Sequence, residues 1–235
     1  MAKYLIALDD GHGMETAGKR TPKFADGSIM HENEFNRAVI NKMDVMLKHC
    51  GIDTLLVAPT DKDTPLRERT NLANEYKATL YYSQHANAFD GTFKGKNPSG
   101  ISTHIYPGSK ESKRLAECVH KHLVQGTRQV DRGIVENNFH VLRETTMPAI
   151  LVEAAFMDNV REARLLKTDE FREEVATEAV KGICEYLGVK FIPMESATET
   201  VYRVQVGEYS NQDNANKARE RLKLLGYNAI VVASK

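Results

Sequence analysis

Three side chains that could bind a metal ion or move a proton each come at the end of a short apolar run. They are His12, His85 and Glu153. Apolar runs of this length, rich in valine, isoleucine, leucine and tyrosine, are typical of buried parallel strands. Because sites in open α/β sheets form at the carboxyl ends of the strands, we expect these side chains to meet at one sheet edge. Two imidazoles and a carboxylate there could form the centre of a zinc hydrolase.

The residues around these side chains favour a site over an incidental position. Gly11 and Gly13 flank His12, which allows a sharp turn that leaves the imidazole exposed. Glu153 lies within an apolar run, where a carboxylate is costly unless it is used or paired. Partial desolvation should raise its pKa, which suits a general base working near neutral pH. The structural alternatives are a tight turn at His12, a strand-capping His85 and a salt-bridged Glu153.

A catalytic zinc site needs a third protein ligand and an open position. His31 and Glu32 begin an HExxH metalloprotease motif, but Phe35 stands where its second histidine is required. Glu32 or Glu34 could supply the ligand, because the loop after His12 must return near the sheet edge. The spacing leaves both open, and either could instead be an acidic residue that stabilises a first helical turn.

The remaining features with possible chemistry have simpler interpretations. The three cysteines are far apart and form no CxxC motif, so we expect buried free thiols and a chain folded in a reducing compartment. We expect structural or surface roles for five further histidines, which are His49, His104, His120, His122 and His140.

Alternating strand and helix patterns predict an α/β fold, with a mainly parallel open sheet and helices on both faces. The predicted strands are Tyr4–Leu8, Thr54–Val57, Thr79–Gln84, Ile101–Tyr106, a short one at Val141–Arg143, and Ala149–Glu153. The predicted helices are Glu34–His49, Pro65–Tyr76, Ser109–Val124, Val160–Lys167 and Asp169–Leu187. Gly188 is expected to cap the end of the last helix.

The pattern predicts a catalytic domain at residues 1–187, a linker at 188–200 and a small βαβ unit at 201–235. The unit consists of a strand at Val201–Val206, a helix at Asn211–Leu225 and a strand at Ala229–Val232. Residues 200–235 carry six Lys and Arg against three Asp and Glu, whereas the whole chain has 32 of each class. This change in charge is what a separate module would show.

Composition excludes several classes of function. The chain is 41% hydrophobic and 27% charged with a net charge of zero, so it lacks the basic footprint of a nucleic-acid-binding protein. The first apolar run is too short for a signal peptide, and no stretch approaches a transmembrane helix. We therefore expect no nucleic-acid partner and no membrane insertion.

Four short motifs appear in order along the body. They are Asp9-x-Gly11-His12-Gly13, Glu32-x-x-Phe35-Asn36, Ser83-x-His85-x-Asn87 and Pro148-Ala149-Ile150-Leu151-Val152-Glu153-x-x-Phe156-Met157-x-Asn159. Together they resemble the zinc-dependent N-acetylmuramoyl-L-alanine amidases of the third amidase type, a family of autolysins, sporulation lysins and phage endolysins. The resemblance covers roughly residues 3–187.

The resemblance implies a peptidoglycan hydrolase that cleaves the amide between N-acetylmuramic acid and L-alanine. It favours Glu32 over Glu34, because the family's ligand stands three residues before the apolar position held here by Phe35. Asp10 departs from the family, where many members have proline, and it adds a negative charge near the metal. The implied zinc ligands are His12, Glu32 and His85, and the implied catalytic residue is Glu153.

The tail resembles a SPOR peptidoglycan-binding module. The similarity rests on Tyr202-Arg203-Val204-Gln205-Val206-Gly207, Ala215, Leu222, Gly226-Tyr227-Asn228-Ala229 and Val231. Such modules normally contain two βαβ repeats and this chain carries one, so we expect a weak homodimer through residues 201–235. We expect an enzyme made in the cytoplasm that acts at the bacterial cell wall after lysis or release. The alternatives are a zinc peptidase acting on the stem peptide and a non-catalytic wall-binding protein.

Overall fold

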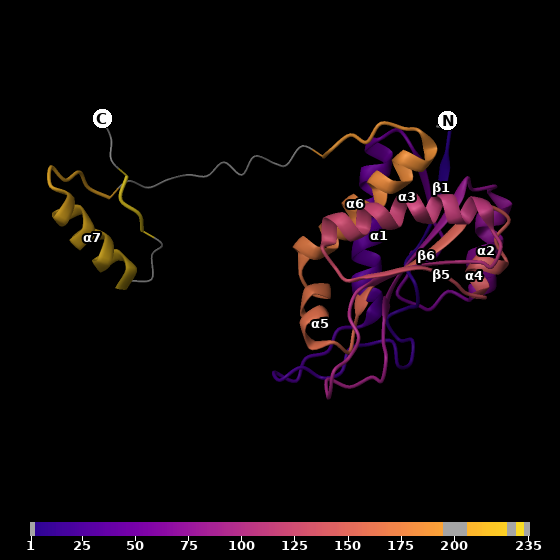
Figure 1. Cartoon of the computed structure of the whole chain (residues 1–235), viewed down its shortest axis with the longest axis horizontal. Coiled ribbons are helices and arrows are strands. Elements are labelled where there is room, and N and C mark those ends of the chain that lie inside the picture. Colours follow the sequence, from indigo (N-terminus) through magenta and orange to yellow (C-terminus); the bar gives the residue numbers. More distant parts are fainter. Residues whose placement is uncertain (1–2, 195–205, 225–228, 233–235) are drawn as a thin grey trace. The chain divides into compact units, whose positions relative to one another are not determined.

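The computed structural model describes residues 3–194, 206–224 and 229–232 of the chain. The chain divides into two units, residues 1–194 and 195–235, which are described separately (Figure 1). In the part of the chain that is described, no helix is long and apolar enough to cross a membrane.

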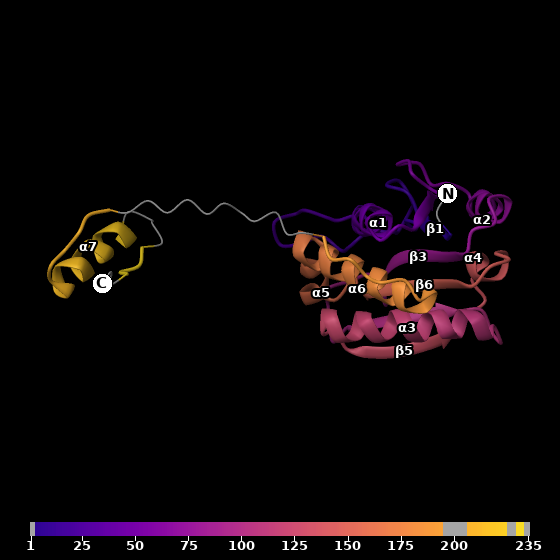
Figure 2. The same ribbon diagram turned by 90° about the horizontal axis from the view of Figure 1, so that it is seen from above.

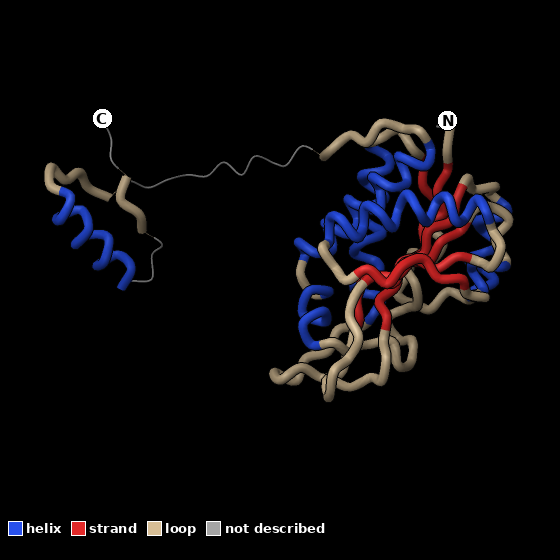
Figure 3. The backbone as a smooth tube through the Cα atoms, viewed as in Figure 1, coloured by secondary structure: helices blue, strands red, loops and turns tan. Residues whose placement is uncertain are grey.

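A six-stranded sheet forms the centre of the first unit (Figure 3). Its strands are β1 (Leu5–Asp9), β2 (Asp53–Leu56), β3 (Leu80–Asn87), β4 (Ile101–Ile105), β5 (Asp131–Glu136) and β6 (Ala149–Phe156). Their order across the sheet is β2-β1-β3-β6-β4-β5. The first four in this order are parallel, whereas β4 is antiparallel to β6 and parallel to β5. The mainly parallel sheet is therefore confirmed, and β1, β3 and β6 are neighbours whose carboxyl ends share one edge.

Helices cover both faces of the sheet, as predicted (Figure 2). They are α1 (Glu32–His49), α2 (Leu66–Glu75), α3 (Lys110–Thr127), α4 (His140–Arg143), α5 (Val160–Leu166) and α6 (Asp169–Leu187). The larger hydrophobic core joins one face to α1, α3 and α6, and a smaller core joins the other face to α2 and α4. The apolar residues of α1 recur at helical spacing, so that Phe35, Val39 and Met43 are all buried. Gly188 ends α6 in the left-handed conformation, as predicted.

The structure corrects the prediction in three places. Val141–Arg143, predicted as a strand, belongs to the helix α4. The prediction was wrong because two apolar residues are too few to distinguish a helical from a strand period. The strand β5 was not predicted, since it is an edge strand whose sequence contains a glycine and exposed charges. Strands β3 and β6 extend beyond their predicted ends, so His85 and Glu153 lie inside the strands.

Part of the predicted linker packs on the first unit. Val189 and Phe191 lie against the larger core, and the Ile192 amide donates to Cys50 Sγ at 3.3 Å. All three thiols are free and Cys50 and Cys184 are buried, as predicted, whereas Cys118, also predicted to be buried, is only partly buried.

The second unit contains the helix α7 (Gln212–Leu224), close to its predicted bounds. Asn211 Oδ1 accepts a hydrogen bond from the Asp213 amide at 2.7 Å and caps the start of the helix. The predicted strand at 201–206 lies outside the described residues except for Val206. Residues 229–232 are described and are not assigned to a strand.

Candidate metal centre and catalytic site

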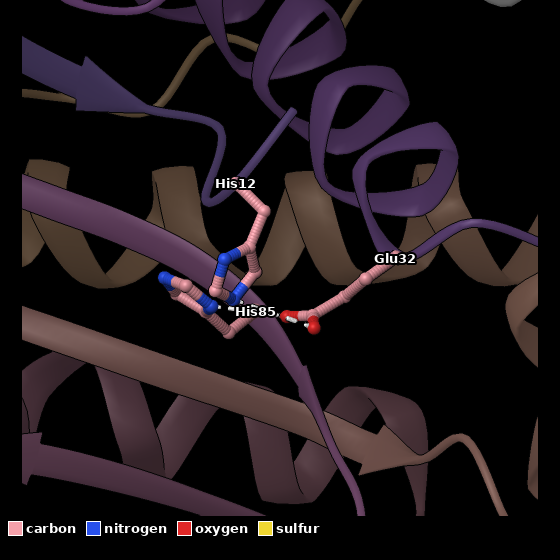
Figure 4. A group of neighbouring side chains, drawn as sticks. All are labelled: His12, Glu32 and His85. Atoms are coloured by element: carbon pink, nitrogen blue, oxygen red, sulfur yellow. Dashed lines mark hydrogen bonds and ion pairs between the residues drawn. The ribbon is translucent and has the colours of Figure 1, made fainter. Parts of the chain in front are cut away.

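Three ligand-type side chains from distant parts of the sequence converge at the carboxyl edge of the sheet (Figure 4). His12 follows β1, Glu32 opens α1 and His85 lies near the end of β3. One ligand atom from each lies within 4.8 Å of the others. His85 Nδ1 is 3.0 Å from Glu32 Oε1, and His12 Nε2 is 3.5 Å from Glu32 Oε2. Two nitrogen donors and one oxygen donor thus surround a single point.

The start of α1 separates the roles of the two glutamates that spacing left open. Glu34 caps the helix, because its Oε1 accepts from the His31 amide at 2.7 Å. Glu32 points instead into the protein, where its side chain is only 1% exposed. Its Oε1 accepts from the Ala86 amide at 3.1 Å as well as contacting His85. The helix therefore brings Glu32 into the cluster and leaves Glu34 outside it.

Close packing around His12 explains its two flanking glycines. His12 itself has a left-handed φ of 65°. A Cβ on Gly11 would lie 2.3 Å from His85 Cε1, and a Cβ on Gly13 would lie 2.4 Å from the Asp63 amide nitrogen. Neither glycine has a positive φ. Gly11 is therefore needed for space beside the His85 imidazole and Gly13 for space beside the backbone of Asp63, whereas the left-handed residue of the turn is His12.

Electrostatics prepare the cluster for a cation. Burial would raise the pKa of Glu32, but the hydrogen bond with His85 and the nearby imidazoles outweigh it and lower the pKa to about 2. Burial alone would lower the pKa of His85, but its contact with Glu32 raises it. Burial lowers the pKa of His12 to about 4, so this imidazole is neutral at pH 7. Glu32 is thus an ionised carboxylate in the resting site.

Glu153 lies beside the cluster on the neighbouring strand. Its register partner in β3 is His85 and its partner in β4 is Ser102. Glu153 Oε2 is buried and has no hydrogen-bond partner among the described residues. Burial raises the pKa of Glu153 to about 7. The structure therefore places a carboxyl group that can gain and lose a proton near neutral pH next to the metal-type ligands.

Comparison with known protein families identifies the family to which a chain with this site belongs. The N-acetylmuramoyl-L-alanine amidase family matches residues 6–185, which include the cluster and Glu153. The chain belongs to this family. Its reaction is hydrolysis of the amide bond between N-acetylmuramic acid and L-alanine in peptidoglycan, so the expected enzyme class is confirmed. The SPOR domain family matches residues 187–233 of the amidase, in agreement with the predicted resemblance of the tail.

Individual relatives support the assignment. The amidase is 29% identical to the sporulation-specific N-acetylmuramoyl-L-alanine amidase of Bacillus subtilis (strain 168), over 97% of this chain and 84% of that protein. It is 33% identical to the endolysin of Bacillus phage SPP1, over 79% of this chain and 67% of that protein. The catalytic domain of the amidase CwlV from Bacillus (Paenibacillus) polymyxa var. colistinus superposes with a TM-score of 0.71 at 32% identity. That match covers 80% of this chain and 99% of that domain.

A buried arginine of the amidase, which no sequence pattern indicated, supports the His12 turn. Arg69 from α2 is 1% exposed and lies 2.5 Å from Asp9 Oδ1 through Nη1. Its Nη2 donates to the His12 carbonyl at 3.0 Å. Asp9 Oδ2 accepts in turn from Ser83 Oγ at 2.7 Å. Asn33 Nδ2 donates to the same His12 carbonyl at 3.2 Å, so the turn is held from two sides.

The charge of Asp10, which departs from the family pattern, is paired. Arg37 Nε lies 2.7 Å from Asp10 Oδ2, and Arg37 Nη1 lies 2.5 Å from Asp61 Oδ1. Burial still raises the pKa of Asp10 to about 6. Arg37 of α1 thus joins Asp10 in the loop after β1 to Asp61 in the loop after β2, and Asp10 is not among the clustered ligands.

Two further histidines have structural hydrogen bonds in the amidase. His104 contacts Ser102 Oγ through Nε2 at 3.0 Å and Asn137 Nδ2 through Nδ1 at 2.7 Å. His120 contacts Asp131 Oδ1 through Nε2 at 2.8 Å. Neither belongs to the metal-type cluster found among the described residues.

Two cavities flank the cluster. The larger, of about 440 Å³, is lined by His12 and His85 together with apolar side chains such as Leu66 and Phe139. It also contains His140, which we expected to have only a structural or surface role. The smaller, of about 270 Å³, is lined by Glu153. A substrate whose reacting bond lies at the cluster can therefore extend to either side.

Proposed function

We propose that the amidase is zinc-dependent, with His12, Glu32 and His85 as the metal ligands and Glu153 as the general base and acid. The observation that carries this proposal is the convergence of three donor atoms within 4.8 Å beside a buried carboxyl group. It is supported by the family to which the chain belongs.

The chemistry of the donor set fits zinc. Two imidazoles and one carboxylate form a common set for catalytic zinc, and three protein ligands leave one position open. Glu32 Oε2 is buried without a hydrogen-bond partner among the described residues, and a cation would satisfy it. When bound, zinc would polarise the scissile carbonyl and favour ionisation of a water molecule.

The residues of the chain supply the remaining parts of the reaction. Glu153 accepts the proton of the attacking water on its free carboxylate oxygen. It then donates that proton to the nitrogen of L-alanine as the amide bond breaks, which lets the peptide leave as a neutral amine. The Ala86 amide donates to Glu32 Oε1 and holds this carboxylate in place.

Metal analysis of purified variants tests the ligand set. His85→Ala should lose zinc and activity together, because one of three ligands is removed. His104→Ala should keep both, since His104 is a buried histidine of β4 that lies outside the cluster. Full zinc occupancy in His85→Ala would show that the ligand set is wrong.

Product analysis separates the amidase from the two alternatives. Digested cell walls should contain new amino groups of L-alanine and intact glycan strands. A stem-peptide peptidase would expose other amino groups, and a non-catalytic binding protein would expose none. The presence of Glu153 disfavours a binding protein, because binding alone does not need an unpaired buried carboxyl group.

For the second unit we propose wall binding and weak homodimerisation through residues 201–235. The described part exposes several apolar side chains, which are Val206, Tyr209, Ile230, Val231 and Val232. A unit of this size has little core of its own, and a second copy would cover such side chains. Because peptidoglycan is the wall polymer, we place the enzyme's action at the bacterial cell wall.

A further inference from the structure

The smaller cavity contains a lysine that the reaction described above does not use. Lys19 lines this cavity together with Asn87, Glu153 and Met157. Its Nζ lies 4.0 Å from Glu32 Oε2, while its side chain remains 43% exposed. An ammonium group is therefore next to the reacting groups and still accessible to a ligand.

The backbone of Lys19 is fixed relative to the cluster. Its carbonyl accepts from the Glu32 amide at 2.9 Å, and its amide donates to the Thr16 carbonyl at 3.2 Å. The next residue, Arg20, forms an isolated antiparallel bridge with His31. The loop thus holds the backbone of Lys19 against the start of α1. Because Glu32 begins the same helix, the position of Lys19 relative to Glu32 is fixed.

A metal ion at the cluster would change the partners available to Lys19. Glu32 would then share its charge with the ion, and Glu153 would be engaged with water. An ammonium group at the wall of a cavity is best satisfied by an anion, and charge-assisted hydrogen bonds are the strong ones. The cavity is therefore suited to a substrate group that carries a negative charge.

The substrate has such a group on only one side of the scissile bond. The acetylated sugar on the lactyl side is uncharged. On the other side, L-alanine is followed by a D-glutamate that is linked through its γ-carboxyl, so its α-carboxyl is free. One residue of chain spans about 3.3–3.6 Å. With the scissile amide at the cluster, a carboxylate on the second residue is therefore within reach of Lys19.

We propose that Lys19 binds the α-carboxylate of the second stem residue, and that the smaller cavity holds the peptide half of the substrate. This inference rests on the proposed amidase function. The larger cavity, whose walls include Leu66, Phe139 and Leu151, would then take the uncharged sugar side. Lys19 is in this sense a specificity-determining residue, which favours a free carboxylate over a carboxamide.

Two soluble fragments that differ in one group test the assignment. Both are N-acetylmuramoyl dipeptides, one ending in D-isoglutamate and the other in D-isoglutamine. The zinc-loaded full chain should cleave the acid about five- to tenfold more efficiently in kcat/KM. This preference is somewhat smaller than that of a buried hydrogen bond to a charged group, because Lys19 is partly exposed. Lys19→Met should raise KM for the acid alone and remove the preference, and Lys19→Arg should keep it.

Binding without turnover provides a second readout. In zinc-loaded Glu153→Gln, calorimetry should show tighter binding of the acid fragment, and adding Lys19→Met should abolish the difference. Lys113→Met, which changes an exposed lysine of α3, is the matched control and should alter nothing. Equal handling of both fragments by the parent chain, or an equal fall in kcat for both in Lys19→Met, would overturn the assignment. Failure of the parent to release any L-alanine amine from fragments or walls would instead refute the proposed function.

Discussion

The ion pair between Arg69 and Asp9 offers a quantitative test of how the site is supported. Both side chains are almost completely buried, and Nη1 lies 2.5 Å from Oδ1. Arg69→Met fills a similar volume but leaves the buried Asp9 carboxylate without its charged partner, while the Ser83 hydroxyl still donates to it. It also removes a donor from the His12 carbonyl. Breaking a buried pair in this way typically costs about 3–5 kcal/mol.

The double variant Asp9→Asn/Arg69→Met isolates the uncompensated charge. It removes the buried carboxylate that the single variant leaves unpaired, so it should be more stable than Arg69→Met. Arg67→Met changes an exposed arginine two residues away in α2 and is the matched control. Its free energy of unfolding should stay within about 0.5 kcal/mol of the parent's.

Equilibrium unfolding in urea on metal-free protein measures these differences without a contribution from bound zinc. A loss of 3–5 kcal/mol is a large part of the ~5–15 kcal/mol that stabilises a typical domain. Arg69→Met should therefore lower the urea midpoint markedly at an unchanged slope. The reasoning is refuted if this variant loses less than about 1 kcal/mol, or if the double variant is no more stable than it.

Two further predictions concern Glu153 and the tail. Glu153→Gln should keep zinc but lower the rate of wall lysis by about 10²–10⁴-fold, the usual contribution of a general base. Because a base must be ionised and burial raises the pKa of Glu153 to about 7, kcat/KM of the parent should fall as pH drops below 7. Parent-like activity in Glu153→Gln, loss of its metal, or a flat profile between pH 5 and 8 would contradict this role. Truncation after residue 194 should leave cleavage of soluble fragments intact and weaken binding to sacculi, and sedimentation of the full chain at tens of micromolar should reveal a dimer. Unchanged pull-down by sacculi would count against wall targeting, and a monomer would count against dimerisation.

The position of the site could be predicted from the sequence because it depends on strand ends. His12 follows β1, and His85 and Glu153 lie in β3 and β6. These three strands are parallel neighbours, and parallel strands bring their carboxyl ends to one edge. Spacing alone did not choose between Glu32 and Glu34, because both occupy the first turn of one helix, and it was the family resemblance that favoured Glu32. Only the capping bond of Glu34 and the inward direction of Glu32 separate them in the structure.

Other parts of the site left no local pattern in the sequence. Arg69 lies in the first turn of α2 among charged residues, a pattern typical of a solvent-exposed helix surface. Arg67 and Glu68 beside it are indeed exposed, whereas Arg69 is buried. Its partner Asp9 is far away in the chain, and an ion pair across the fold has no spacing that would reveal it. The same holds for Lys19, whose proximity to Glu32 depends on how the loop after His12 returns to α1.

The distribution of the three proposed metal ligands along the chain also has a consequence for when the enzyme becomes active. The turn after β1, the start of α1 and the end of β3 meet only after non-local strand pairing has closed the sheet, which is the slow part of folding for such topologies. In a nascent or partly unfolded chain these side chains are therefore far apart, and the metal site is not assembled. Catalytic activity therefore appears only with the cooperatively folded native state, and any local opening that separates β1 from β3 abolishes it.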